Sequence, residues 1–345
     1  MARRVVLHIG AMKSGTSYLQ SLLFADKQRL AAAGVLVPGE VWTDQATAVR
    51  QALNPPDRGP RQRWDDLTRE VRAADGTAVI SMEYLGPMRR AAIPGVVEDL
   101  GADEVTVVVT ARDLNRGLVS MWQETIQNGR TWGWHDYVRD AESRRQLSGA
   151  EAFDRSTPGG SFWRQQDLVR MVGNWARAVG MDNVVLVTVP QPGAPTRLLA
   201  DRFSEASGID LDPDAPVSMA NESLGLASLL ALREVNELLV ERGVRWPTGQ
   251  QLRKRVLAKT VMAARRDTEP RLGLVTPDWV REQSRRIVAE LRASGVCCVG
   301  EWSDLDPVDV RGVDPDDVPA DEVHRAAVAA LAGLVAEIVG KRSDP

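Results

Sequence analysis

Cysteine is scarce in this chain, and its placement excludes a fold stapled by disulfides. The two cysteines, Cys297 and Cys298, are adjacent in a chain of 345 residues. Neighbouring cysteines rarely pair with each other, and two of them cannot cross-link a chain of this length. We therefore expect a reduced protein, located in the cytoplasm.

Long apolar runs and an excess of one charge are also missing. No stretch approaches the roughly 18 consecutive apolar residues of a membrane span, and the apolar run after Arg3 and Arg4 is too short for a secretory signal. The net charge is −4, so no global basic field attracts nucleic acid. We expect neither a membrane span nor a nucleic-acid partner, and any anion must be recognised locally.

The residues that are present suit an ordinary globular protein with a substantial core, since 43% are hydrophobic and 26% are charged. Uninterrupted β-branched runs alternate with segments of helical period, which is typical of parallel strands covered on both faces. Strands are expected at 4–10, 35–39, 77–85, 104–112 and 183–190. Helices are expected at 15–34, 114–128 and 166–179.

The second half of the chain is mainly helix-patterned, from about 223 to 293 and again, rich in alanine, from about 320 to 340. No internal repeat is present. We predict one α/β domain over 1–345, a P-loop-like three-layer sandwich with a central parallel sheet. Its α/β core would occupy 1–215, and a mainly helical extension would occupy 216–345.

The stretch GAMKSGTSYLQ, residues 10–20, joins the first expected strand to the first expected helix. Such a junction offers unpaired backbone N–H groups and the positive end of the helix dipole. Gly10 and Gly15 permit a sharp turn close to an anion. A cation and three hydroxyls add further donors: Lys13, Ser14, Thr16 and Ser17. We predict that this loop binds a terminal phosphate group; the alternative is an ordinary turn.

The order of residues in this loop differs from that of the Walker A loop in triphosphate enzymes. There the lysine follows the second glycine, whereas Lys13 precedes Gly15. Walker-type enzymes also hold Mg²⁺ with a loop hydroxyl and an aspartate on a second strand. In this chain one interior strand ends in Arg112 and another in Glu83. A cation at such a position indicates a second anion site, and no metal site is expected.

The segment KSGTSYLQ (13–20) resembles the 5′-phosphosulfate loop of sulfotransferases that use 3′-phosphoadenosine 5′-phosphosulfate (PAPS), and HIGAMKSGTSYLQ is similar to the bacterial members. The second signature of that family is a strand-ending arginine followed eight residues later by a serine. The stretch ARDLNRGLVSMW supplies Arg112 and Ser120 at this spacing. The resemblance extends over about residues 4–190, with a further similar segment at 220–239.

The resemblance implies metal-free, in-line transfer of a sulfuryl group from PAPS to a hydroxyl or amine of a small-molecule, glycan or natural-product acceptor. It implies that residues 13–17 hold the 5′ end of the donor and that Arg112 and Ser120 hold the 3′-phosphate. Arg116 lies one helical turn before Ser120 and is a candidate for a third contact. Tyr18 is a candidate for stacking on adenine, with helix packing as the alternative.

Two residues are candidates for the base that accepts the acceptor's proton. Glu83 ends an apolar strand, where a carboxylate is costly without a partner or a function, and it matches by resemblance the glutamate base of glycosaminoglycan sulfotransferases. Its alternative role is a salt bridge to Arg89 or Arg90. His8 is the second candidate, and its alternative is a core-facing or supporting role. Lys13 is expected to neutralise the charge on the departing phosphate oxygen.

The acceptor is less defined by the sequence. The stretch 153–166 contains Pro158, Gly159 and Gly160, so it is expected to be a loop, either a lid over the acceptor or plain loop packing. The family's R-K-G-x-x-G-D-W-K stretch has no clear counterpart, which leaves the third arm of the 3′-phosphate site and any homodimer contact unassigned. A homodimer stays among the expected states.

Two other functions stay open at this point. One is a nucleotide kinase or another triphosphate enzyme, which the position of Lys13 disfavours. The other is a catalytically silent module that retains the donor pocket and binds the desulfonated product, 3′-phosphoadenosine 5′-phosphate (PAP).

Overall fold

The computed structural model describes residues 3–53, 60–216, 223–244, 254, 257–258 and 261–343. The chain forms two compact units, each assembled from three separate segments. The first unit comprises Met1–Leu114, Arg164–Ser218 and Arg281–Pro307, and the second comprises Asn115–Trp163, Met219–Val280 and Val308–Pro345. The division therefore does not follow a single boundary near residue 215, and whether the chain behaves as one domain stays a prediction.

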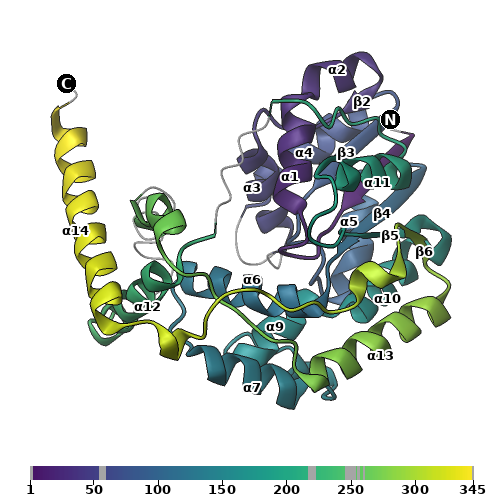
Figure 1. Ribbon diagram of the computed structural model, residues 1–345. Helices are drawn as coiled ribbons and strands as arrows, with labels where there is room; N and C mark the ends of the chain where they lie inside the picture. Colours follow the sequence, from purple (N-terminus) through teal and green to yellow (C-terminus); the bar gives the residue numbers. More distant parts are fainter. Residues whose placement is uncertain are drawn as a thin grey trace. The chain divides into compact units, whose positions relative to one another are not determined.

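The first unit contains the sheet. Its described strands are β1 (Arg4–His8), β2 (Val35–Leu36), β3 (Thr77–Ser81), β4 (Glu104–Ala111), β5 (Val184–Thr188) and β6 (Cys297–Val299). They form one parallel sheet in the order β2-β3-β1-β4-β5-β6 (Figure 1). This topology confirms the predicted α/β class with a central parallel sheet flanked by helices.

Helices of the first unit connect these strands. They are α1 (Thr16–Ala25), α2 (Lys27–Ala32), α3 (Trp42–Leu53), α4 (Gln62–Ala73), η2 (Arg90–Ala92), α5 (Ile93–Leu100), α10 (Leu168–Val179), η3 (Met181–Asn183), α11 (Arg197–Ser207) and η6 (Trp302–Leu305). Three helices contain residues of both units, because a unit boundary falls within each: α6 (Leu114–Gln127), α9 (Pro158–Gln166) and α13 (Asp278–Ser294).

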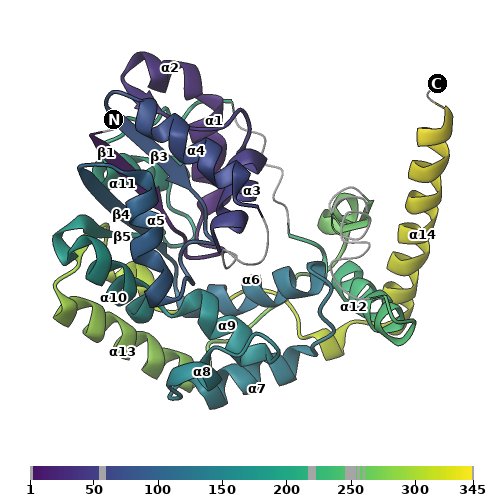
Figure 2. The same ribbon diagram turned by 180° about the vertical axis from the view of Figure 1, so that it is seen from behind.

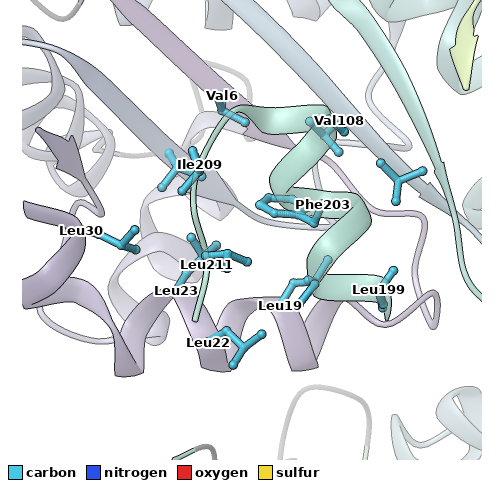
Figure 3. Packing of buried hydrophobic residues seen from close by; sticks show 14 of the residues in the cluster. Val6, Leu19, Leu22, Leu23, Leu30, Val108, Leu199, Phe203, Ile209 and Leu211 are labelled. Atoms are coloured by element: carbon cyan, nitrogen blue, oxygen red, sulfur yellow. The ribbon is translucent and has the colours of Figure 1, made fainter. Parts of the chain in front are cut away.

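The two faces of the sheet carry separate cores. Val6, Val79 and Val108 point to the face covered by α1 and α11, where Phe203 is fully buried among leucines (Figure 3). Alternate strand residues point to the opposite face, on which α10 contacts β4, β5 and α5 (Figure 2). Because both faces of the sheet are covered by helices, its strands contain continuous runs of valine and isoleucine.

Two expected elements differ in detail from the structure. The helix expected over 15–34 is broken at Asp26, whose carboxylate accepts hydrogen bonds from Arg29. The expected loop over 153–166 contains helix α9, which begins at Pro158, a favoured first helical residue. A Cβ at Gly159 would lie 2.3 Å from the carbonyl oxygen of Asp140, which lies in the helix Trp134–Arg144, so this glycine allows α9 to pack closely against that helix.

The second unit is helical. Besides its parts of α6, α9 and α13, it contains α7 (Trp134–Arg144), α8 (Gly149–Ala152), α12 (Leu226–Glu241), η5 (Ala263–Thr268), η7 (Pro315–Asp317) and α14 (Ala320–Ser343). Aromatic rings fill its interior: Trp122 and Trp134 meet edge to face at 5.4 Å, and Tyr137 packs on Trp134 and Phe162. Of the segment 220–239, residues 220–222 lie outside the described residues.

None of the described helices combines the length and the apolar character that crossing a lipid bilayer requires.

Replacing Phe203 with alanine is expected to lower the free energy of unfolding of the first unit by about 3–5 kcal/mol, because it empties a fully buried site. Urea unfolding followed by circular dichroism measures this loss. The control Val41→Ala shortens a side chain that is 55% exposed, and it should cost less than about 0.5 kcal/mol. Equal losses in the two variants would contradict the placement of this core.

Candidate functional site

The candidate site lies at the carboxyl ends of β3, β1 and β4 in the first unit. β1 runs between β3 and β4, so the loop that follows it, residues 9–15, emerges between the ends of its two neighbours. Glu83 follows β3 and Arg112 follows β4. β2 and β3 extend the sheet on one side of β1, and β4 to β6 extend it on the other. Ligands of open parallel sheets bind at such a switch in strand order.

The backbone of the loop has a positive φ angle at three positions. Gly10 has φ 102°, Lys13 has φ 62° and Gly15 has φ 82°. Lys13 is not a glycine, and such a left-handed backbone is found mostly where the surroundings impose it, often at functional sites. Helix α1 begins at Thr16 directly after Gly15 and has no side-chain cap. The Tyr18 N–H donates to the Gly15 carbonyl oxygen at 3.1 Å, so the N–H groups of Thr16 and Ser17 are the first-turn donors suited to an anion.

A chain of buried polar side chains holds this loop on the sheet. His8 Nδ1 lies 2.7 Å from Ser81 Oγ, and His8 Nε2 lies 3.1 Å from Thr110 Oγ1. Thr110 Oγ1 lies 2.6 Å from the Ser14 hydroxyl, which donates to the Ala11 carbonyl oxygen at 2.5 Å. The four side chains are completely buried. The loop is thereby fastened to both neighbouring strands.

Burial also determines the charge of His8. Desolvation lowers the pKa of its imidazole from 6.5 to about 3, so the ring is neutral at physiological pH. The ring packs edge to face on Phe203 at 5.2 Å. A neutral imidazole offers one donor and one acceptor, which suits its position between the hydroxyls of Ser81 and Thr110.

Glu83 lies against the loop at the end of β3. A Cβ added at Gly10 would lie 3.2 Å from the Glu83 Cβ. Its carboxylate accepts a hydrogen bond at 2.9 Å from Gln20 Nε2, which also donates to the Ser81 carbonyl oxygen at 3.1 Å. Within the described part of the chain, no ion pair joins Glu83 to Arg89 or Arg90. The alternative role, a salt bridge, is therefore not formed, and the Gln20 amide orients the carboxylate.

Arg112 reaches the loop from the end of β4. Its Nη1 donates to the Lys13 carbonyl oxygen at 3.2 Å. On the neighbouring residue, the Met12 carbonyl oxygen accepts from Gln166 Nε2 at 2.8 Å. Two cationic residues, Lys13 and Arg112, are thus brought to the same turn, and cations gathered at a helix N-terminus favour an anionic ligand.

The remaining residues that the sequence predicts to bind the donor molecule lie in two places. Thr16 is buried, whereas Ser17 and Tyr18 are partly exposed on the first turn of α1. Burial, with Asp201 and Asp214 nearby, raises the pKa of the Tyr18 hydroxyl. The other two residues, Arg116 (buried) and Ser120 (partly exposed), lie on α6 in the second unit. Their cooperation with Arg112 stays a prediction.

The other two histidines belong to the second unit. His135 Nε2 lies 3.1 Å from Asp314 Oδ1 and 3.2 Å from Asp316 Oδ2, and His324 is exposed. The cluster of His135, Asp314 and Asp316 has ligand atoms within 4.8 Å of one another. The contacts of the imidazole nitrogen with the two carboxylates account for this geometry, and two of the three side chains are exposed, so we assign no metal to it.

Three supporting residues were missed by the sequence reasoning: Thr110, Gln20 and Gln166. Thr110 interrupts a valine run, and Gln20 lies on the buried side of α1. A buried polar side chain needs a partner, and this requirement is the signal that identifies both. Gln166 stands at the end of a segment expected to be a loop, and no local pattern distinguishes it.

Comparisons with known proteins add little to this geometry. No protein-family model matches the sequence, and no curated protein is a significant match. Among solved structures, the chain is similar to a sulfotransferase from Alicyclobacillus acidocaldarius, with 15% sequence identity and a TM-score of 0.38. The match covers 73% of this chain and 100% of that chain. Likeness at this level does not establish a family.

The buried neutral histidine predicts a loss of stability in acid. The folded-state pKa of His8 is about 3, below the unfolded value of 6.5, so the unfolded chain binds the proton more readily as the pH falls. Its contribution is complete above pH 6.5 and declines below it, by about 2 kcal/mol at pH 5. Urea titrations at pH 7 and pH 5 measure the difference.

The matched variant is His8→Gln, which retains a polar amide and removes the titrating ring. The variant should lose about 2 kcal/mol less than the parent between pH 7 and pH 5, since every other titratable residue is the same in both proteins. Identical pH dependence in the two proteins would show that His8 is not the buried titrating group.

Proposed function

We propose that this protein is a PAPS-dependent sulfotransferase that uses the loop after β1 to hold the 5′ end of the donor. The observation that carries the proposal is the meeting of Lys13 and Arg112 at this loop, where Arg112 donates to the Lys13 carbonyl oxygen. A ligand with a single anionic group would need only Lys13 and the N-terminus of α1. A donor with phosphates at both its 5′ and 3′ positions would also use Arg112, the cation at the end of the neighbouring strand.

The fit of the loop to the 5′-phosphosulfate follows from its donors. Lys13 to Ser17 present backbone N–H groups at an uncapped helix start, and Lys13 supplies the charge that neutralises the departing phosphate oxygen. The Ser14 hydroxyl is used within the protein, on Ala11 and Thr110, so we assign the backbone N–H of Ser14 to the donor. The bound donor supplies an activated sulfuryl group, and no metal is needed to create it.

Arg112 is proposed to hold the 3′-phosphate together with Ser120, with Arg116 as a further contact on the same face of α6. A guanidinium presents paired N–H donors that match phosphate oxygens. The hydrogen bond from Nη1 to the Lys13 carbonyl oxygen holds Arg112 at the loop. Tyr18, partly exposed on the first turn of α1, is assigned to the adenine ring.

Glu83 is proposed as the base that takes the proton of the acceptor hydroxyl or amine. It is partly exposed and is oriented by Gln20, as a positioned proton acceptor requires. His8 is the weaker candidate because it is fully buried and held by two hydroxyls. We assign to His8 the role of positioning the loop. The proposed acceptor class is a small molecule bearing a hydroxyl or an amine.

Substituting Arg112 with alanine should weaken PAP binding by about 10- to 100-fold, the usual cost of losing hydrogen bonds to a charged group. Binding of adenosine 5′-phosphosulfate, which lacks the 3′-phosphate, should change by less than about threefold. Isothermal titration calorimetry measures both affinities. Arg63→Ala, which removes an exposed arginine of the same unit, controls for the loss of a positive charge. Equal losses for the two ligands would refute the assignment to the 3′-phosphate.

Substituting Glu83 with glutamine should lower turnover by at least about 100-fold, because the amide cannot accept the proton. PAP affinity should stay within about threefold of the parent. Release of PAP from PAPS, measured with a panel of phenols, amines and sugars, gives the turnover. The exposed Glu98→Gln is the matched control.

Two outcomes would overturn the assignment of the base. Full turnover by Glu83→Gln would exclude this residue. Loss of turnover with intact PAP binding in His8→Gln, and not in Glu83→Gln, would transfer the role to His8.

A protein that binds PAP but releases none from PAPS with any acceptor would be the silent binding module.

A further inference from the structure

Helix α14 (Ala320–Ser343), at the end of the second unit, has two faces of different character. One face is packed within its own unit, where the helix contacts α12 (Figures 1 and 2). Ala326 and Ala330 are buried on this face, and a Cβ at Gly333 would lie 2.4 Å from Val261. The small residues thus mark the side on which α14 is already covered.

The opposite face exposes large apolar side chains. Val328, Leu331, Val335 and Ile338 are 52%, 63%, 52% and 44% exposed. We call these four residues the α14 stripe. Single exposed apolar residues are ordinary, but a row of them along one helix face is typical of a surface that is covered in the functional state.

The spacing of the α14 stripe indicates what covers it. Its members follow one another at intervals of three, four and three residues, which is the a–d spacing of a coiled coil. Valines occupy both a positions, and Leu331 and Ile338 occupy the d positions. β-branched residues at a with leucine at d, as in Val328 and Leu331, favour two strands. The spacing of the α14 stripe therefore suits packing against a second helix with the same spacing, such as α14 of another copy.

Charge favours the same occupant. Between Ala326 and Val339 the one ionisable residue is Glu337, which is half-buried on the packed side of the helix. No like charges oppose each other when two such helices meet. Helices that bind membrane surfaces carry lysine and arginine on the face opposite to the apolar one, and this part of α14 has neither residue.

The area available suits a reversible pairing. The α14 stripe and its flanking alanines expose roughly 400–500 Å² per copy, the size of a large patch on a monomer. Two copies would bury about 800–1,000 Å² in total, which corresponds to a weak, transient interface.

We propose that α14 packs its stripe against α14 of a second copy of this chain, forming a two-stranded helical dimer in reversible equilibrium with the monomer. This surface is independent of the proposed sulfotransferase site, and the inference does not rest on that function. The dimer contact uses no residue of the loop after β1.

Sedimentation velocity of the full chain over about 1–200 µM tests the proposal. The parent mass of 37.8 kDa should rise toward twice this value with concentration. The double variant Leu331→Glu/Val335→Glu should stay monomeric throughout, because two copies would bury four carboxylates. Leu331→Ala/Val335→Ala, which keeps the helix intact, should raise the dissociation constant about 10-fold. The control Val41→Glu/Val275→Glu adds the same charge at residues 55% and 76% exposed and should dimerise like the parent.

Circular dichroism of each variant establishes that the fold is retained. A parent protein that is monomeric at all concentrations would overturn the proposal. The α14 stripe would then be covered by another part of the chain or by a lipid surface, and not by a second copy. A dimer that both stripe variants leave unchanged would also overturn it, because the contact would then lie elsewhere.

Discussion

The buried hydrogen-bond chain from Ser81 through His8 and Thr110 to Ser14 is the constraint on which the candidate site depends. These side chains join β3, β1, β4 and the loop in one connected path. Each would be costly to bury alone, and together they satisfy one another. The path fixes a loop whose backbone includes a left-handed lysine, so the free energy of the buried network holds a conformation that the loop sequence alone would not favour.

A loop held in this way would let the carboxyl ends of three strands bind the two anionic ends of the proposed donor. β1 ends in a turn built on glycines and a lysine, β4 ends in Arg112, and β3 ends beside a carboxylate oriented by Gln20. Neighbouring parallel strands deliver these groups to the same edge because their carboxyl ends coincide. The proposed division of labour among Lys13, Arg112 and Glu83 follows from strand order.

Much of the first unit is predictable from the sequence, since strands buried on both faces leave continuous β-branched runs. β6 was missed because three residues at a sheet edge carry no period, and α9 because its glycines, needed for close packing, resemble those of a loop. At the site, the loop and the residues ending β3 and β4 were found by position. Thr110 and Gln166 were not, because a supporting side chain is identified by its partners, and those lie 96 or more residues away.

Calorimetry with PAP in EDTA and with ATP in Mg²⁺ distinguishes a metal-free site for a donor with 5′ and 3′ phosphates from a triphosphate site. We expect PAP to bind in the micromolar range without metal and ATP to bind at least about 10-fold more weakly. Binding of ATP that depends on Mg²⁺, with no binding of PAP, would contradict this expectation and indicate a triphosphate enzyme.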